Sequence, residues 1–154
     1  MSDSQYGSRE GRSISQAAIR LTTFIIKGFH HKQYSTCFFL DLRKAFDTID
    51  HAILLRKLSN SGFRGPIFNY LSSYVSNRKQ YILIGNDKSE ELDIGMGVPQ
   101  GSMIGPELFN IFINDIVKAI DDDVEVILFA DDAAFYVSAS SLILLYAKMR
   151  SLFS

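Results

Sequence analysis

Three carboxylates, each at the end of an apolar run, are the residues of this chain best suited to chemistry. Asp131 and Asp132 follow the hydrophobic stretch 124–129, and Asp41 follows a second apolar stretch, 38–40. A carboxylate in such a place must be solvated, paired or bound to a cation. Two strands that each deliver carboxylates at their ends can hold two divalent cations, and such a site supports in-line phosphoryl transfer.

An ordinary structural role is the alternative for each acidic position taken singly. Asp-Asp pairs are common in turns and at helix N-caps, and Asp41 suits the N-cap of a helix over 42–45. The segment between the two acidic positions favours chemistry. Residues 95–106 contain four glycines and two prolines, which exclude a helix or a regular strand, and an apolar pattern of helical spacing follows. A glycine-rich loop before a helix lets backbone amides approach a phosphate or a sugar closely.

Three segments agree in order and spacing with one known family. They read Phe-Leu-Asp-Leu-Arg-Lys-Ala-Phe-Asp-Thr-Ile-Asp-His (39–51), Gly-Val-Pro-Gln-Gly-Ser-Met-Ile-Gly-Pro-Glu-Leu-Phe (97–109) and Phe-Ala-Asp-Asp (129–132). Together they resemble the palm of reverse transcriptases, and they are most similar to the polymerases of non-LTR (LINE-like) retrotransposons. Residues 5–13 resemble the short motif that precedes the first catalytic strand in this family, although Ser8 stands where the family usually has Phe.

The resemblance implies a metal-binding role for the three carboxylates. Asp41 and Asp131 would hold two divalent cations, and Asp132 would assist them. Mg²⁺ is the expected ion, and Mn²⁺ can substitute for it. Mg²⁺ takes hard oxygen ligands and keeps several waters, so two or three carboxylates together with substrate phosphates are enough.

Four further residues match the nucleotide pocket of the family: Leu42, Phe46, Gln100 and Gly101. Phe46 occupies the position of the aromatic steric gate, which lies under the sugar and rejects a ribose 2′-hydroxyl. Gln100 matches the glutamine that lines the pocket, and Gly101 matches the flexible residue beside it. Asp47 and Asp50 belong to the same sequence motif, 39–51, but a role in a turn or a helix cap is expected for them.

Basic residues are too few to mark the whole chain as a nucleic-acid-binding protein, because the formal net charge is −1. Local pairs do occur, at Arg9 and Arg12 and at Arg78 and Lys79. Taken singly, each is expected to be a solvated surface charge; as a group they are candidates for lining a template groove. The partners that the resemblance implies are an RNA template, a DNA primer, deoxynucleoside triphosphates and the rest of a larger retrotransposon polyprotein.

Composition sets the remaining bounds. The length of 154 residues suits a single domain with a real core. No stretch approaches the roughly twenty apolar residues of a membrane span, so no membrane association is expected. The N-terminus lacks the pattern of a secretory signal, and the single cysteine, Cys37, gives no basis for disulfides. A reducing intracellular compartment is expected, without a choice between nucleus and cytoplasm.

The hydrophobic pattern predicts an α+β fold in which helices back an antiparallel sheet, as the polymerase palm resemblance also implies. The chain is interpreted as a single reverse transcriptase domain fragment, with partial fingers at about 1–34, palm at about 35–154 and no thumb. Helices are predicted at 13–31, 51–60, 66–76, from Pro106 to about 121–123, and at 140–152. A short buried strand is predicted at 35–41, a hairpin at 79–84 and 89–94 across 85–88, and a second hairpin with Asp131 and Asp132 in its turn.

Two functions remain open. The first is an RNA-directed DNA polymerase that adds nucleotides to a primer 3′-hydroxyl by a two-metal mechanism. The alternative is a catalytically inactive, truncated remnant that acts at most as a nucleic-acid- or protein-binding module. Metal-dependent primer extension separates them. A nucleotide cyclase of palm-like architecture would not account for the loop at 98–101.

Overall fold

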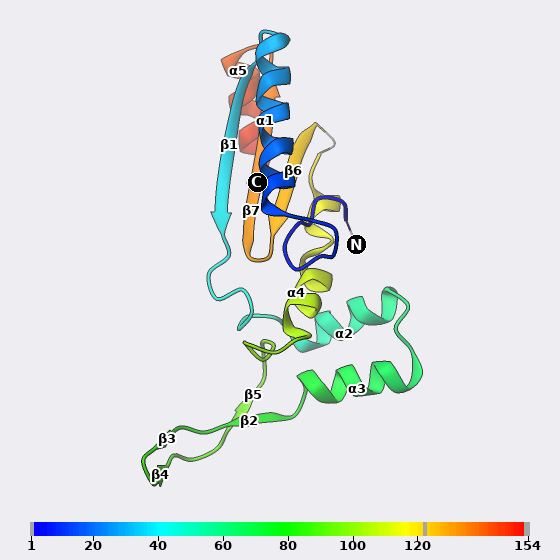
Figure 1. The fold of residues 1–154 in the computed structure, drawn as a ribbon, viewed down its shortest axis with the longest axis vertical. Helices are drawn as coiled ribbons and strands as arrows, with labels where there is room; N and C mark the ends of the chain where they lie inside the picture. The colour runs from blue at the N-terminus through cyan, green and yellow to red at the C-terminus, as the bar shows by residue number, and fades with distance from the viewer. Residues whose placement is uncertain (1, 122, 153–154) are drawn as a thin grey trace. The chain divides into compact units, whose positions relative to one another are not determined.

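Two compact units make up the chain in the computed structural model, which describes residues 2–121 and 123–152 (Figure 1). The sheet unit contains Met1–Arg43 and Ile113–Ser154, and the helix–ribbon unit contains Lys44–Phe112. Each unit contains some of the motifs that were identified in the sequence. The three carboxylates belong to the sheet unit, whereas the glycine-rich loop belongs to the helix–ribbon unit.

A three-stranded antiparallel sheet forms the centre of the sheet unit. Its strands are β1 (Tyr34–Asp41), β6 (Val124–Phe129) and β7 (Asp132–Ala139), in the order β1-β7-β6. The central strand β7 is buried over 133–137, which its apolar sequence favours. The register pairs Asp41 with Asp132 across β1 and β7, and Phe129 with Asp132 across β6 and β7. The predicted antiparallel sheet and the second hairpin are therefore confirmed.

Helices cover both faces of this sheet. Figure 1 shows α1 (Ile14–His30) in front of the strands and α5 (Leu142–Ser151) behind them. Ser13 caps α1 in a capping box with Gln16, as the sequence indicated for this helix start. Apolar side chains of α1, among them Leu21, pack against a cluster on the sheet that includes Tyr136. No helix among residues 2–121 and 123–152 has both the length and the apolar character that crossing a membrane requires.

The edge strand β1 is more exposed than predicted. Phe39 is 73% exposed, and Leu40 is also exposed, so the prediction of a buried strand at 35–41 is wrong. The physical reason is its position, because β1 pairs only with β7 and its other edge has no strand neighbour among the described residues. An apolar sequence alone does not distinguish a central strand from an edge strand.

The helix–ribbon unit consists of two helices, a broken ribbon and a loop that leads into a third helix. Its elements are α2 (His51–Asn60), α3 (Gly65–Val75), β2 (Arg78–Gln80), β3 (Leu83–Ile84), β4 (Asp87–Lys88), β5 (Leu92–Ile94) and α4 (Gly105–Ile113). The strands pair as β2 with β5 and β3 with β4. The predicted hairpin is present, but its turn is the shorter segment 85–86, and the ladder is interrupted where the Ser89 hydroxyl accepts from the Ile82 amide.

Helix α4 ends earlier than predicted. It stops at Ile113, and a separate 3₁₀ turn, η1 (Ile116–Ala119), follows in place of a continuous helix to 121–123. Asn114 and Asp115 stand at the break, and such side chains compete with the backbone for hydrogen bonds and favour turns. The Asn114 side chain in fact accepts a hydrogen bond from the amide of Ser2 at 2.5 Å.

Candidate active site

The three carboxylates lie together at one end of the sheet. Asp41 is the last residue of β1, Asp132 is the first residue of β7, and Asp131 is in the two-residue turn between β6 and β7. The Leu42 amide donates to the Asp131 carbonyl at 3.1 Å, so Leu42 and Asp131 oppose each other as a hydrogen-bonded pair. Asp41 and Asp132 form the next pair, which is of the closer, non-hydrogen-bonded type with both side chains on one face.

Cation binding is the natural complement to this arrangement. Within residues 2–121 and 123–152, no ion pair or side-chain hydrogen bond engages the carboxylates of Asp41, Asp131 or Asp132. Like charges directly opposite each other destabilise a pair of strands, and a divalent cation offsets that repulsion. The described residues contain no group of three or more His, Cys, Asp or Glu placed to hold a metal by themselves. Asp41, Asp131 and Asp132 therefore do not form a complete metal site by themselves, and a Mg²⁺ ion there would need waters and substrate phosphates as further ligands.

The turn that carries Asp131 has an unusual backbone. Ala130 has a φ of 54°, in the left-handed region that a residue with a side chain rarely adopts. The N-terminal segment, which precedes α1, packs directly against this turn. The Tyr6 amide donates to the Leu128 carbonyl, and the Leu128 amide donates to the Ser4 carbonyl, both at 2.8 Å. The motif at 5–13 was identified in the sequence by resemblance, but nothing in its composition indicated that it contacts the hairpin that carries Asp131.

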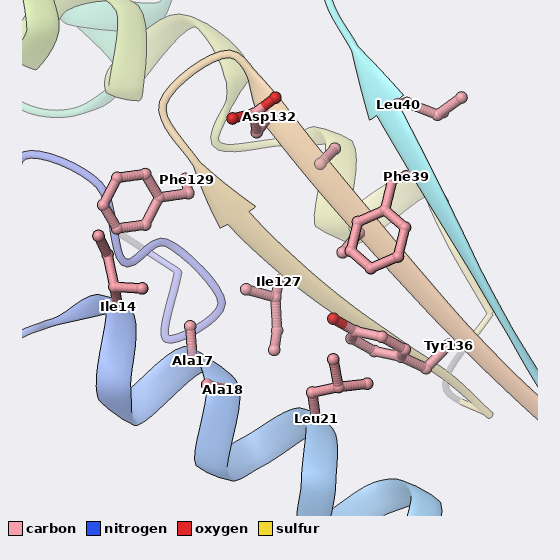
Figure 2. A pocket seen from close by; sticks show the side chains of 12 residues that line it. Ile14, Ala17, Ala18, Leu21, Phe39, Leu40, Ile127, Phe129, Asp132 and Tyr136 are labelled. Carbon is pink, nitrogen blue, oxygen red and sulfur yellow. The ribbon is translucent and has the colours of Figure 1, made fainter.

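An apolar groove of about 500 Å³ runs between α1 and the sheet and reaches Asp132 (Figure 2). Side chains from α1, β1, β6 and β7 line it, including Ile14, Phe39, Phe129 and Tyr136. Burial raises the pKa of Tyr136 to about 12, and the neighbouring Cys37 adds to the shift. The tyrosine is therefore neutral at physiological pH, which leaves Asp132 as the charged group among the residues that line the groove.

In the helix–ribbon unit, Gln100 has a partner that sequence analysis did not identify. Its Nε2 donates to Oδ1 of Asp47 at 2.7 Å, which orients the amide of an otherwise exposed side chain. Asp47 is therefore more than a turn residue. Asp50, in contrast, has the expected cap role, because its side chain accepts from the Ile53 amide at the start of α2.

The loop that carries Gln100 is fixed at Gly97. The φ of Gly97 is +82°, and a Cβ there would lie 2.8 Å from both Cα and O of Asp47. The Gly97 amide donates to the Ile49 carbonyl at 2.8 Å. Its own carbonyl accepts from Nη2 of Arg78 at 2.8 Å and lies 2.8 Å from Nε2 of His51. Residues of the motif at 39–51 thus hold the motif at 97–109.

The other nucleotide-pocket candidates differ in exposure. The ring of Phe46 is half-buried and packs against Phe109 with a centroid separation of 4.8 Å, while its carbonyl accepts from the Val98 amide. Gly101 is exposed, with a φ of +75° and open space where a Cβ would be. A cavity of about 480 Å³ borders this loop and is lined by Asp47 and Gln100 among others.

The basic candidates mostly bind other parts of the chain. Arg9 and Arg12 both pair with Asp3, at 3.5 Å and 2.8 Å. Arg78 holds the Gly97 loop as described above, whereas the Lys79 side chain is exposed. These contacts are intramolecular, so a role in binding nucleic acid stays a prediction for all four residues.

Comparison with known proteins identifies the family of this chain. A sequence model of the family described as "Reverse transcriptase (RNA-dependent DNA polymerase)" matches residues 1–152. Two similar proteins of Drosophila melanogaster are a probable RNA-directed DNA polymerase from transposon BS, 35% identical over 114 residues, and the RNA-directed DNA polymerase from mobile element jockey, 28% identical over 145 residues. These matches cover 74% and 90% of this chain but 12% and 16% of the relatives, so the chain spans a small part of their length.

A solved structure with a similar fold is telomerase from Candida albicans, in complex with a fragment of telomeric RNA. The TM-score is 0.70 at 10% sequence identity, and the match covers 97% of this chain and 29% of the telomerase chain. At this identity the likeness concerns the fold alone. It confirms the predicted α+β, palm-like class.

Proposed function

We propose, because this chain belongs to the reverse transcriptase (RNA-dependent DNA polymerase) family, that it supplies the catalytic palm of an RNA-directed DNA polymerase of the non-LTR retrotransposon type. The observation that carries the proposal is the direct opposition of Asp41 and Asp132, with Asp131 in the adjoining turn. Three carboxylates from two paired strands, without protein partners among the described residues, match the needs of phosphoryl transfer.

In the proposed reaction the primer 3′-oxygen attacks the α-phosphorus of a deoxynucleoside triphosphate, and pyrophosphate leaves. Asp41 and Asp131 would hold divalent cations, Mg²⁺ with Mn²⁺ as a substitute, and Asp132 would assist them. Such cations would supply a lowered pKa for the attacking hydroxyl and charge neutralisation on the triphosphate. The Leu42 amide ties the turn to β1, so ligands from the two strands keep a fixed separation.

Nucleotide selection is proposed for the helix–ribbon unit. Phe46 acts as the steric gate against a ribose 2′-hydroxyl, and its packing on Phe109 supports a fixed ring position. Gln100 lines the nucleotide pocket with its amide oriented by Asp47. Gly101 leaves the backbone beside it open to a close approach by the nucleotide. Leu42, which belongs to the sheet unit, is proposed as a nucleotide-binding residue on the resemblance alone.

The proposed partners are an RNA template, a DNA primer and deoxynucleoside triphosphates. The chain spans 12% to 16% of the relatives named above, which supports a larger polyprotein as its natural context. Exposed Lys79 is the basic candidate freest to contact nucleic acid, with Arg9, Arg12 and Arg78 as further candidates. Intracellular localisation and the division into partial fingers at about 1–34 and palm at about 35–154 belong to the same proposal.

The alternative is a catalytically inactive remnant that binds nucleic acid or a partner protein. It is less favoured, because mutation without selection would not preserve Gln100 together with the three carboxylates. The match to the family over residues 1–152 supports the same preference.

Primer extension on an RNA template tests the proposed function. The chain is compared with Asp41→Asn and Asp131→Asn in Mg²⁺ and in Mn²⁺, and Asp121→Asn serves as the matched control because Asp121 is an exposed residue of the same unit. We expect extension by the parent and the control, and a loss of about 10³-fold or more in both site variants. Equal extension by Asp131→Asn would contradict the assignment. A folded parent chain without extension would support the inactive alternative.

A further inference from the structure

We infer that Gln5 is a positioning residue whose side-chain amide holds the hairpin turn that carries Asp131. Gln5 is only 1% exposed. Its Oε1 accepts two backbone hydrogen bonds, from Gly7 at 2.9 Å and from Ala130 at 3.4 Å. One oxygen therefore joins the N-terminal segment to the first residue of the turn. The inference rests on the proposed function, because it concerns how a proposed metal ligand is oriented.

The turn needs such support because its backbone is unfavourable. Ala130 has a φ of 54°, a conformation that persists in a non-glycine residue only where its surroundings impose it. Ala130 directly precedes Asp131, so the direction of its peptide sets where the carboxylates point. Its amide is the group that Gln5 accepts from.

The neighbours of Gln5 leave the turn little freedom. Hydrogen bonds from Tyr6 to Leu128 and from Leu128 to Ser4 fix the segment on both sides of Gln5 against β6. At Gly7 the approach is closer still, because a Cβ there would lie 2.4 Å from the Ala130 nitrogen and 2.9 Å from the carbonyl carbon of Phe129. Only glycine lets the segment lie against the turn at this distance.

The nitrogen of the Gln5 side-chain amide also supports a positioning role. Nε2 of Gln5 is buried and has no hydrogen-bond partner among the described residues. An unsatisfied buried donor is destabilising, and an apolar side chain of equal length would avoid it. The glutamine is therefore explained by what Oε1 does at the turn. Being neutral, the amide also adds no charge beside the carboxylates.

The test substitutes methionine, which matches glutamine in length and lacks the acceptor. Gln5→Met is compared with Gln33→Met, a matched control, because the Gln33 side chain bonds Ser138 near the far end of β7. Three readouts are taken on the 154-residue chain: Mn²⁺ binding by electron paramagnetic resonance, exchange of the Ala130 amide by NMR, and the Mg²⁺ dependence of primer extension. The melting temperature reports whether each variant folds.

We expect Gln5→Met to fold as the parent does. The Mn²⁺ dissociation constant and the Mg²⁺ concentration for half-maximal extension should rise about tenfold or more, as for other residues that orient metal ligands, with little change in the KM for the triphosphate. Exchange at Ala130 should accelerate about tenfold as the turn opens locally. Gly7→Ala should give the same pattern through displacement of the turn. Gln33→Met should leave all three readouts unchanged.

Unchanged Ala130 exchange and unchanged Mn²⁺ affinity in folded Gln5→Met would overturn the inference. A melting temperature that falls with no shift in the metal response would assign Gln5 a structural role only, and would also overturn it. If the parent neither extends a primer nor binds Mn²⁺, the proposed function fails. The exchange rate at Ala130 still decides in that case whether Gln5 fixes the turn.

Discussion

At the residue scale, the contact between Asp47 and Gln100 connects two motifs that lie 53 positions apart. Both side chains are exposed, so solvent competes with the bond, and its net contribution is expected to be modest. The bond instead fixes the orientation of the Gln100 amide. The amide nitrogen points to Asp47, and the amide oxygen is left for a ligand.

We predict that Asp47→Ala raises the KM for the deoxynucleoside triphosphate about 2- to 10-fold, with a small change in kcat, since a hydrogen bond of this kind is worth about 0.5–1.5 kcal/mol. Steady-state extension with varied triphosphate measures it, and Asp87→Ala in the exposed ribbon is the control. A KM that stays at the parent value in Asp47→Ala, while Gln100→Ala raises it, would contradict the role of Asp47.

Sequence reasoning predicted the strand-end positions of the carboxylates but missed two side-chain contacts. The positions of Asp41, Asp131 and Asp132 were predictable because each follows an apolar run, and their role as metal ligands stays a prediction. The link from Asp47 to Gln100 and the contact of Gln5 with the turn were not predictable, because each depends on how distant segments meet after folding. The relevant signals were weak, namely a glutamine among apolar neighbours and an aspartate inside a family motif.

At the element scale, the helix starts and every helix end except that of α4 were predicted to within two residues. Ser13 and Asp50 are recognisable caps, because a short polar side chain before an apolar helical pattern has few other uses. The end of α4 at Ile113 was missed, because the apolar spacing continues past the Asn114–Asp115 break. Burial of β1 was also misjudged, since edge position depends on pairing and not on composition.

The glycine-rich loop provides a prediction with an internal control. Gly97→Ala should lower the free energy of unfolding by about 2–4 kcal/mol, because a positive φ and contacts of 2.8 Å with Asp47 both oppose a Cβ. Gly95→Ala, two residues earlier, should change it little, because nothing lies within 4 Å of the added atom. Urea unfolding of both variants measures the difference. Equal losses in the two would show that the Gly97 contact is not tight in solution.

At the scale of the whole molecule, the amount of exposed apolar surface is the main feature. On α1, Ile19, Ile26 and Phe29 share one side at helical spacing, and Phe29 is 76% exposed. In the helix–ribbon unit, Leu83 and Ile84 of the ribbon are exposed as well. Apolar patches of this kind mark interaction surfaces or promote association.

We predict that the isolated chain self-associates as its concentration rises. Light scattering over a concentration series measures the effect, and the double variant Ile26→Lys with Phe29→Lys should shift the series toward the monomer. The substitutions alter exposed positions of α1, so the fold should be retained, which circular dichroism checks. A parent chain that stays monomeric at the highest concentration would contradict the prediction.

The pairing of Asp41 with Asp132 has a consequence for which length changes the gene can accept. Side chains alternate across a strand, so one residue inserted or deleted within β1 or β7 would send one carboxylate to the opposite face of the sheet. The lengths of β1 and β7 are therefore constrained as strictly as the identities of Asp41 and Asp132. A change of length at the ribbon tip, 85–86, moves no carboxylate to another face. Insertions and deletions during the history of this family should therefore accumulate there and avoid the two strands.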